Sequence, residues 1–278
     1  MTAQSVSAAG KSKARRAANS SAMEYAARWG LAARGVIYLL IGVIALRVAF
    51  GDSGGKEADR SGALEEIATK PGGSVMLWVL AVGLVGMALW RLSEAAFGQA
   101  GPDGQKASKR LVSGFRAVFY GFVAFSVISF AAGTKGNKSG DQESKDITAK
   151  IVDLPAGQFL LGVGGLTIAI IGVVIAVRAI KRSYHKHLKL GEMSQRARKI
   201  TDFTGVTGGI ARGVLFAAIG VFALVAAVKY EPDDVKGIDD TLRTFTETPA
   251  GPWLLVAVAV GLMLFGVFSF AMARWRKV

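Results

Sequence analysis

Six apolar segments limit what this chain can fold into more than any other feature. They span residues 35–50, 75–90, 117–133, 159–177, 213–228 and 253–273. A helix needs about 20 apolar residues to cross a bilayer, and the shorter segments are flanked by arginine, whose stem can lie in hydrocarbon while its head reaches the interface. A hydrophobic content of 51% is also too high for an ordinary soluble surface. The sequence therefore predicts an all-α membrane protein with six transmembrane helices.

The charged residues are divided unevenly between the two sides of such a protein. Most of the 34 basic residues lie before the first segment, after the last, and in the 91–116 and 178–212 loops, whereas most of the 20 acidic residues lie in the other three loops. Basic loops stay in the cytoplasm, so we predict that both termini are cytoplasmic. The net charge of +14 is thus a topology signal, and no nucleic-acid partner is expected.

The sequence repeats itself three times. The segments RGVIYLLIG, RAVFYGFVA and RGVLFAAIG begin at Arg34, Arg116 and Arg212. Each has an aromatic residue one helical turn after the arginine, and small residues one and eight positions after it. Small residues two turns apart allow a neighbouring helix to approach closely. The aromatic residues are Tyr38, Tyr120 and Phe216, and the small pairs are Gly35 with Gly42, Ala117 with Ala124, and Gly213 with Gly220.

The second helix of each repeat follows a matching proline segment, around Pro71, Pro155 and Pro249. The polar sequence before each proline has partial helical spacing, which predicts a short amphipathic helix on the outer face. The second helices end in Arg91, Arg178 and Arg274. We therefore divide the chain into a disordered basic cytoplasmic tail (1–25), repeat 1 (26–98), repeat 2 (99–182), and repeat 3 with its preceding basic loop (183–278).

Each repeat contains two membrane helices, so all three repeats enter the membrane in the same direction. Copies arranged in this way are related by an axis along the membrane normal. We predict a six-helix bundle of three tandem helical hairpins with pseudo-threefold symmetry.

These motifs resemble the bacterial membrane proteins known as the domain of unknown function 1206 family, which look like three tandem copies of a two-helix unit. The resemblance covers roughly residues 26–275. The second copy departs from the family pattern because Ala117 follows its arginine in place of glycine. The resemblance implies the fold and a location in the bacterial cytoplasmic (inner) membrane, and it implies no activity.

The residues available for chemistry argue against an enzyme and against a bound cofactor or metal. The chain has no cysteine, which excludes thiolate metal sites and cysteine nucleophiles. His185 and His187 fall in a basic loop, where they cannot ligate a haem within the membrane. The apolar segments contain no Asp or Glu, although ion-coupled transporters usually keep an ionisable group at this depth. No catalytic motif is present.

Two functional hypotheses remain. The first is a non-enzymatic accessory, scaffold or lipid-binding protein, whose partners are anionic membrane lipids or another membrane protein. The second is a passive channel or transporter for a small or anionic solute. A binding protein should have its small-residue stripes filled by neighbouring helices, whereas a pore needs a continuous polar lumen.

Arg34, Arg116 and Arg212 are the candidate site residues. Each starts an equivalent helix, so threefold packing would bring them to one depth as a cationic ring near the cytoplasmic interface. A guanidinium offers a planar fork to phosphate oxygens, and helix N-termini would add partial positive charge. This pattern predicts a site for an anionic lipid headgroup or another phosphate. In the alternative interpretation, each arginine points outward to lipid phosphates and packs only on the aromatic residue of its own helix.

Overall fold

The structure, a computed structural model, is a helical protein with six helices long and apolar enough to cross a membrane. It describes residues 21–51, 57–99, 104–133, 140–154, 156–229, 235–246 and 251–277. The prediction of a multi-pass all-α membrane protein is therefore confirmed. Residues 1–20 of the predicted disordered tail lie outside the described residues. Residues 21–25, which the sequence analysis also assigned to that tail, belong to the first helix.

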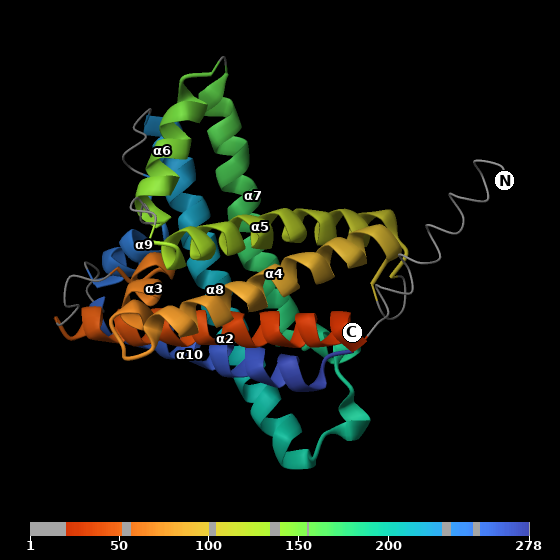
Figure 1. Ribbon diagram of the computed structural model, residues 1–278. Helices are drawn as coiled ribbons and strands as arrows, with labels where there is room; N and C mark the ends of the chain where they lie inside the picture. Colours follow the sequence, from red (N-terminus) through yellow and green to blue (C-terminus); the bar gives the residue numbers. More distant parts are fainter. Residues whose placement is uncertain are drawn as a thin grey trace.

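Each repeat contributes a long helix, a short helix and a second long helix (Figure 1). Repeat 1 contains α2 (Ser21–Ala49), α3 (Arg60–Ala68) and α4 (Gly73–Phe97). Repeat 2 contains α5 (Ala107–Ala131), α6 (Gly140–Val152) and α7 (Gly157–Ile180). Repeat 3 contains α8 (Gln195–Lys229), α9 (Ile238–Thr246) and α10 (Gly251–Trp275), and two short 3₁₀ helices, η1 (Ser183–His187) and η2 (Leu190–Glu192), precede it.

Local sequence sets the boundaries of the short helices. Asp59 caps α3, because its side chain accepts a hydrogen bond from the backbone N–H of Gly62. Gly72, directly after Pro71, adopts a left-handed conformation with φ of +76°, which glycine tolerates without steric cost. Ala156 takes the same left-handed region at the equivalent place before α7. The short helix, the turn and the second long helix are thus encoded alike in repeats 1 and 2.

The second long helix of each repeat packs along the first long helix of the next repeat. The three pairs are α4 with α5, α7 with α8, and α10 with α2, which closes the order back to the first repeat. Gly35 and Gly42 of α2 lie against α10, and Gly213 and Gly220 of α8 lie against α7. In the membrane, such close approach replaces the hydrophobic effect as the main source of helix association. Neighbouring helices therefore fill the predicted small-residue stripes of α2 and α8, and Ala117 and Ala124 of α5 are buried.

We call the end of the bundle where α2 begins and α10 ends the terminal end. Two arginines stabilise the helix pairs there. Arg28 of α2 donates to the carbonyl oxygens of Ala273 and Arg274 in the last turn of α10. Arg110 of α5 donates to the carbonyl oxygens of Ala95 and Ala96 in the last turn of α4 (2.8 Å each). Both satisfy carbonyls that a helix C-terminus leaves without partners.

The contacts within repeats break the symmetry. The long helices pack together in repeat 1 (α2 with α4) and in repeat 3 (α8 with α10), but α5 and α7 of repeat 2 do not pack along each other. Figure 1 shows α10, α2, α4 and α5 running side by side, while α7 and α8 cross this layer at a steep angle. The ring of three helix pairs is therefore open between α5 and α7.

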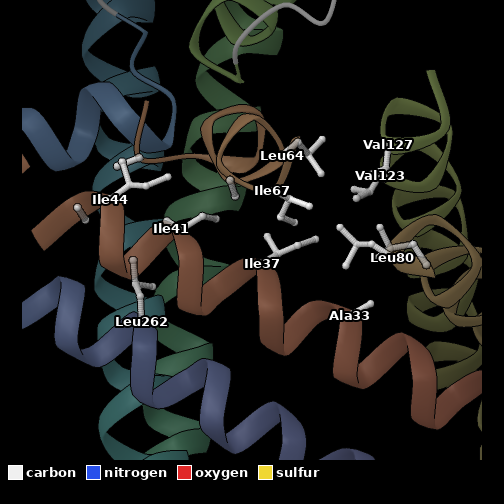
Figure 2. Close-up of a cluster of buried hydrophobic side chains, with 14 of the residues drawn as sticks. Ala33, Ile37, Ile41, Ile44, Leu64, Ile67, Leu80, Val123, Val127 and Leu262 are labelled. Carbon is white, nitrogen blue, oxygen red and sulfur yellow. The ribbon is translucent and has the colours of Figure 1, made fainter. Parts of the chain in front are cut away.

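A continuous apolar core lies between the short helices α3 and α9 and the middle of the layer. In Figure 2, Ile37 and Ile41 of α2 lie on the side of the helix that faces Leu64 and Ile67 of α3, and Leu80 of α4 and Val123 of α5 belong to the same cluster. Leu64, Leu242 and Leu262 in this core are fully buried. The region under α3 and α9 is thus filled by packed aliphatic side chains.

Polar contacts link the three short helices, which we call the cap, in a ring. Arg60 of α3 pairs with Glu143 of α6 at 3.1 Å. Lys145 of α6 pairs with Asp240 of α9 at 3.3 Å. Asp239 of α9 closes the ring by accepting a hydrogen bond of 2.6 Å from the backbone N–H of Ala58, directly before α3. Each contact joins a different pair of repeats, so the cap has the threefold order of the predicted architecture.

Candidate anion-binding site

The three predicted arginines lie inside their helices, not at helix starts. Because α2 begins at Ser21, α5 at Ala107 and α8 at Gln195, each arginine is more than about two turns from the N-terminus of its helix. The expectation that helix N-termini add positive charge at this level is therefore wrong. The helices start earlier than the apolar segments do because polar residues such as Arg28 find partners at the terminal end.

Arg34 points toward the interior of the protein. Its Nε donates to the Ser269 hydroxyl of α10 at 3.1 Å. Its guanidinium also hydrogen bonds to the hydroxyl of Tyr120 on α5, and it lies 5.2 Å from the ring centroid of Phe265 on α10. The partners of Arg34 are therefore neutral groups from the other two repeats.

Arg212 is surrounded by aromatic rings. Its guanidinium carbon lies 4.9 Å from the ring centroid of Phe265, 5.2 Å from that of Phe216 and 5.6 Å from that of Tyr38. Cation–π attraction of this kind is worth about 0.5–2 kcal/mol per contact. The Nε of Arg212 is nevertheless buried without a hydrogen-bond partner among the described residues. Arg34 of repeat 1 and Arg212 of repeat 3 thus both contact the ring of Phe265.

Arg116 completes the group but is more accessible. Its side chain is exposed, and it is close enough to Arg91, Glu94 and Arg212 to interact with them electrostatically. Within the part of the chain that the structure describes, no hydrogen bond or ion pair is assigned to its guanidinium. The structure thus brings the three repeat arginines into one electrostatic neighbourhood, and their partners include rings of other repeats as well as their own.

Sequence reasoning missed three further charged residues beside this group. Arg91 and Glu94 of α4 form a buried ion pair at 2.6 Å, and Arg276, just after α10, lies 3.9 Å from the same carboxylate. Both guanidinium groups also face the ring of Trp90, at 4.1 and 4.7 Å from its centroid. Ser113 of α5 donates to Glu94 at 3.1 Å. Glu94 could have been noticed in the sequence, because it is an acidic residue on the basic side of the chain.

The charges of this region do not balance. We call Arg34, Arg91, Arg116, Arg212 and Arg276 the arginine cluster, and Glu94 is the carboxylate that contacts it. Like charges brought together out of bulk water are costly unless an opposite charge compensates them. A phosphate group fits this need, since its several oxygens accept hydrogen bonds from more than one guanidinium. The arrangement is therefore suited to holding an anion.

A hook of polypeptide covers the cluster at the terminal end. The loop at 183–192 meets the end of α10 through an isolated antiparallel bridge between Leu188 and Arg276, and Leu188 is buried among residues of α2, α4 and α10. Burial, with a further contribution from Arg276, lowers the pKa of His187 to about 4. Burial and the neighbouring Arg91 lower the pKa of Arg276 to about 9. The basic loop is thus part of the folded protein.

His185, the other histidine, lies outside the cluster. Its Nε2 is 2.5 Å from Oδ1 of Asp202, which also accepts a hydrogen bond from Tyr184 at 3.1 Å. Among the described residues, no group of three or more His, Asp or Glu side chains is placed to hold a metal ion.

The chain matches the family described as Domain of Unknown Function (DUF1206) three times, over residues 29–98, 112–182 and 207–276. It is also similar to an uncharacterized protein, YxxB, of Bacillus subtilis (strain 168). The two are 30% identical over 244 residues, which cover 87% of this chain and 87% of the relative. A comparison with solved structures finds no match. Each family match takes in two long helices and the cap helix between them, so the chain belongs to the DUF1206 family as three tandem copies of its unit.

Proposed function

We propose that this protein is a non-enzymatic lipid-binding protein of the bacterial cytoplasmic membrane, with both termini in the cytoplasm, and that its arginine cluster holds the phosphate of an anionic lipid headgroup. The observation that carries the proposal is the convergence of Arg34 and Arg212 on the Phe265 ring. Neither guanidinium has a carboxylate partner in the part of the chain that the structure describes. A charged group at this depth in a membrane protein is costly and is usually retained for binding or transport.

The filled small-residue stripes and the apolar core under the cap support binding over the alternative, a passive channel for a small or anionic solute. A pore would need a polar path through the bundle, whereas Leu64, Leu242 and Leu262 are fully buried in this apolar core. The anion would therefore be held at the cluster. An accessory or scaffold role follows if the bound lipid links this protein to another membrane protein.

The experiment that tests the proposal is native mass spectrometry of the protein purified in a mild detergent from membranes that contain phosphatidylglycerol and cardiolipin. The wild type should retain an anionic phospholipid. The R34Q/R116Q/R212Q variant should retain at least tenfold less. The matched control is R178Q/R196Q/R198Q, which removes the same charge from exposed positions at the terminal end and should retain lipid as the wild type does.

Two results would overturn the proposal. One is a folded R34Q/R116Q/R212Q variant that retains as much anionic lipid as the wild type. The other is selective flux of a small anion through reconstituted wild-type protein without retained lipid, which would favour the channel.

The orientation is tested separately with single cysteines, because the chain has none of its own. A cysteine at Lys199, beside the basic loop, should react with a membrane-impermeant reagent only after the cells are opened. A cysteine at Lys150 in the cap should react in intact spheroplasts. The reverse pattern would place the termini outside.

A further inference from the structure

In repeats 1 and 3, the two long helices meet through small residues. Gly83 of α4 packs on Ala33 of α2, with 3.1 Å between the alanine Cβ and the position a Cβ would take on the glycine. Gly261 of α10 packs on Ala211 of α8 in the same way. Each glycine stands twelve residues after the proline of its repeat, and each alanine directly precedes the arginine of its repeat. The same pair of positions therefore closes both repeats.

Repeat 2 has larger residues at these two positions. Phe115 directly precedes Arg116, and Thr167 stands twelve residues after Pro155. Both side chains are exposed, Phe115 by 73%. The Phe115 ring is too bulky for the close approach that alanine gives, and Thr167 places a branched side chain where the other repeats have glycine in tight contact. In agreement with this, α5 and α7 do not pack along each other.

The neighbouring positions of repeat 2 are open for the same reason. On the first helix, Phe119 is 52% exposed, whereas its equivalents Ile37 and Leu215 are buried. On the second helix, Ile171 is 43% exposed, whereas its equivalents Met87 and Phe265 are buried. These exposures differ between positions that the repeat makes equivalent, so they mark the opening itself and not merely a surface that faces the membrane.

The arginine cluster borders this opening. Arg116 follows Phe115 in the chain, is itself exposed, and interacts electrostatically with Arg212 and Arg91. Protein fills the two ends of the bundle: fully buried Leu64 and Leu242 lie in the cap, and buried Leu188 lies in the hook at the terminal end. The open side of repeat 2 is therefore the route that leads from the membrane to the cations.

We infer that an anionic glycerophospholipid enters the cluster sideways, between α5 and α7, and that Phe115 and Thr167 hold this entrance open. The phosphate lies at Arg116 and the neighbouring guanidiniums, and the acyl chains lie along Phe119 and Ile171. Charge complementarity selects the headgroup, and the apolar faces of α5 and α7 accept the chains. This inference rests on the proposed function, because it names the path by which the lipid reaches the arginine cluster and the position in which it binds there.

The test uses the whole protein in vesicles with a trace of phosphatidylglycerol that carries a photoactivatable diazirine near the carboxyl end of one acyl chain. After illumination, peptide mapping should find crosslinks concentrated at residues 111–122 of α5 and 163–174 of α7. The enrichment should disappear in R34Q/R116Q/R212Q, and a phosphatidylcholine probe with the same chain should not show it. Arginine-dependent crosslinks confined to other helices would overturn the lateral entrance while leaving the proposed function intact.

A second variant tests the entrance without altering the cations. F115A/T167G gives repeat 2 the small residues of the other repeats and should bring α5 against α7, so that retained phosphatidylglycerol falls at least tenfold. The control F125A changes an exposed phenylalanine of α5 away from the opening and should retain lipid normally. A folded F115A/T167G protein that retains lipid as the wild type does would overturn the inference. So would a disulfide between two chains that each carry a single cysteine at exposed Phe119, because it would indicate that a second copy covers the opening.

Discussion

The guanidinium carbon of Arg212 lies 5.6 Å from the ring centroid of Tyr38, although the two residues belong to different repeats. The repeat motif alone pairs each of these residues with a neighbour on its own helix. The structure retains the pairing of Arg212 with Phe216 and adds Tyr38 from the neighbouring repeat. The repeat motif thus codes for contacts between copies as well as for a helix face within each copy.

We predict that replacing Tyr38 with leucine lowers the free energy of unfolding by about 1–3 kcal/mol. The substitution removes the cation–π contact with Arg212 and the edge-to-face contact with Phe265, whose ring centroid lies 4.8 Å away. The matched variant Y38F keeps the ring and should remain within about 1 kcal/mol of the wild type. Thermal unfolding in detergent measures both, and equal stabilities of the two variants would contradict the role of the ring.

The cap should depend strongly on Asp239. The D239A substitution leaves the Ala58 N–H without its acceptor and removes one ion-pair partner of Arg243, whose Nε lies 2.6 Å from the carboxylate. A buried donor left without a partner costs about 1–3 kcal/mol. The neighbouring substitution D240A removes a partly exposed pair with Lys145 and should cost less than about 1 kcal/mol. Thermal unfolding of the two variants gives the comparison. An equal loss of stability in both would show that the hydrogen bond from Ala58 to Asp239 does not contribute more than the exposed ion pair.

The glycine stripes give a prediction with an internal control. A Cβ on Gly220 of α8 would meet backbone atoms of Gly165 and Ala169 on α7, which cannot move without separating the helices. G220A should therefore destabilise the protein by about 1–3 kcal/mol. Gly121 of α5 has no atom within 4 Å of the same position, and G121A should be neutral or stabilising by up to about 1 kcal/mol. Unfolding curves in the same detergent test the pair, and two tolerated variants would argue against tight α7–α8 packing.

The repeat pattern predicted much of this fold. An arginine, an aromatic residue, two small residues and a proline recur in order, and together they place the long helices, the cap helices and the helix pairs. The sequence also shows that repeat 2 differs from the other repeats at Phe115 and Thr167. This difference could be interpreted only once the structure had shown what the alanine and glycine of the other repeats contact.

The arginine cluster was predicted only in part. Arg34, Arg116 and Arg212 share a motif, so symmetry alone suggests that they meet. Arg91, Glu94 and Arg276 lie outside the motif that the first helices share, and they meet because α10 ends beside the last turns of α4. Such a contact depends on where helices stop in three dimensions. The periodicity of the sequence therefore does not predict this contact.

The last prediction concerns the pH dependence of the hook at 183–192. The pKa of His187 is about 4 in the folded protein, because burial and the cations Arg276, Lys109 and Arg91 outweigh the attraction of Glu94. Its ordinary value is about 6.5. Between these values a detached loop binds a proton that the docked loop does not, so docking weakens as the pH falls from about 6.5 toward 4 and is unaffected above 6.5. A spin label on a cysteine introduced at exposed Lys186 should become more mobile at pH 5 than at pH 7.5, and H187Q should remove this difference. Equal mobility of the wild type at both values would contradict the prediction.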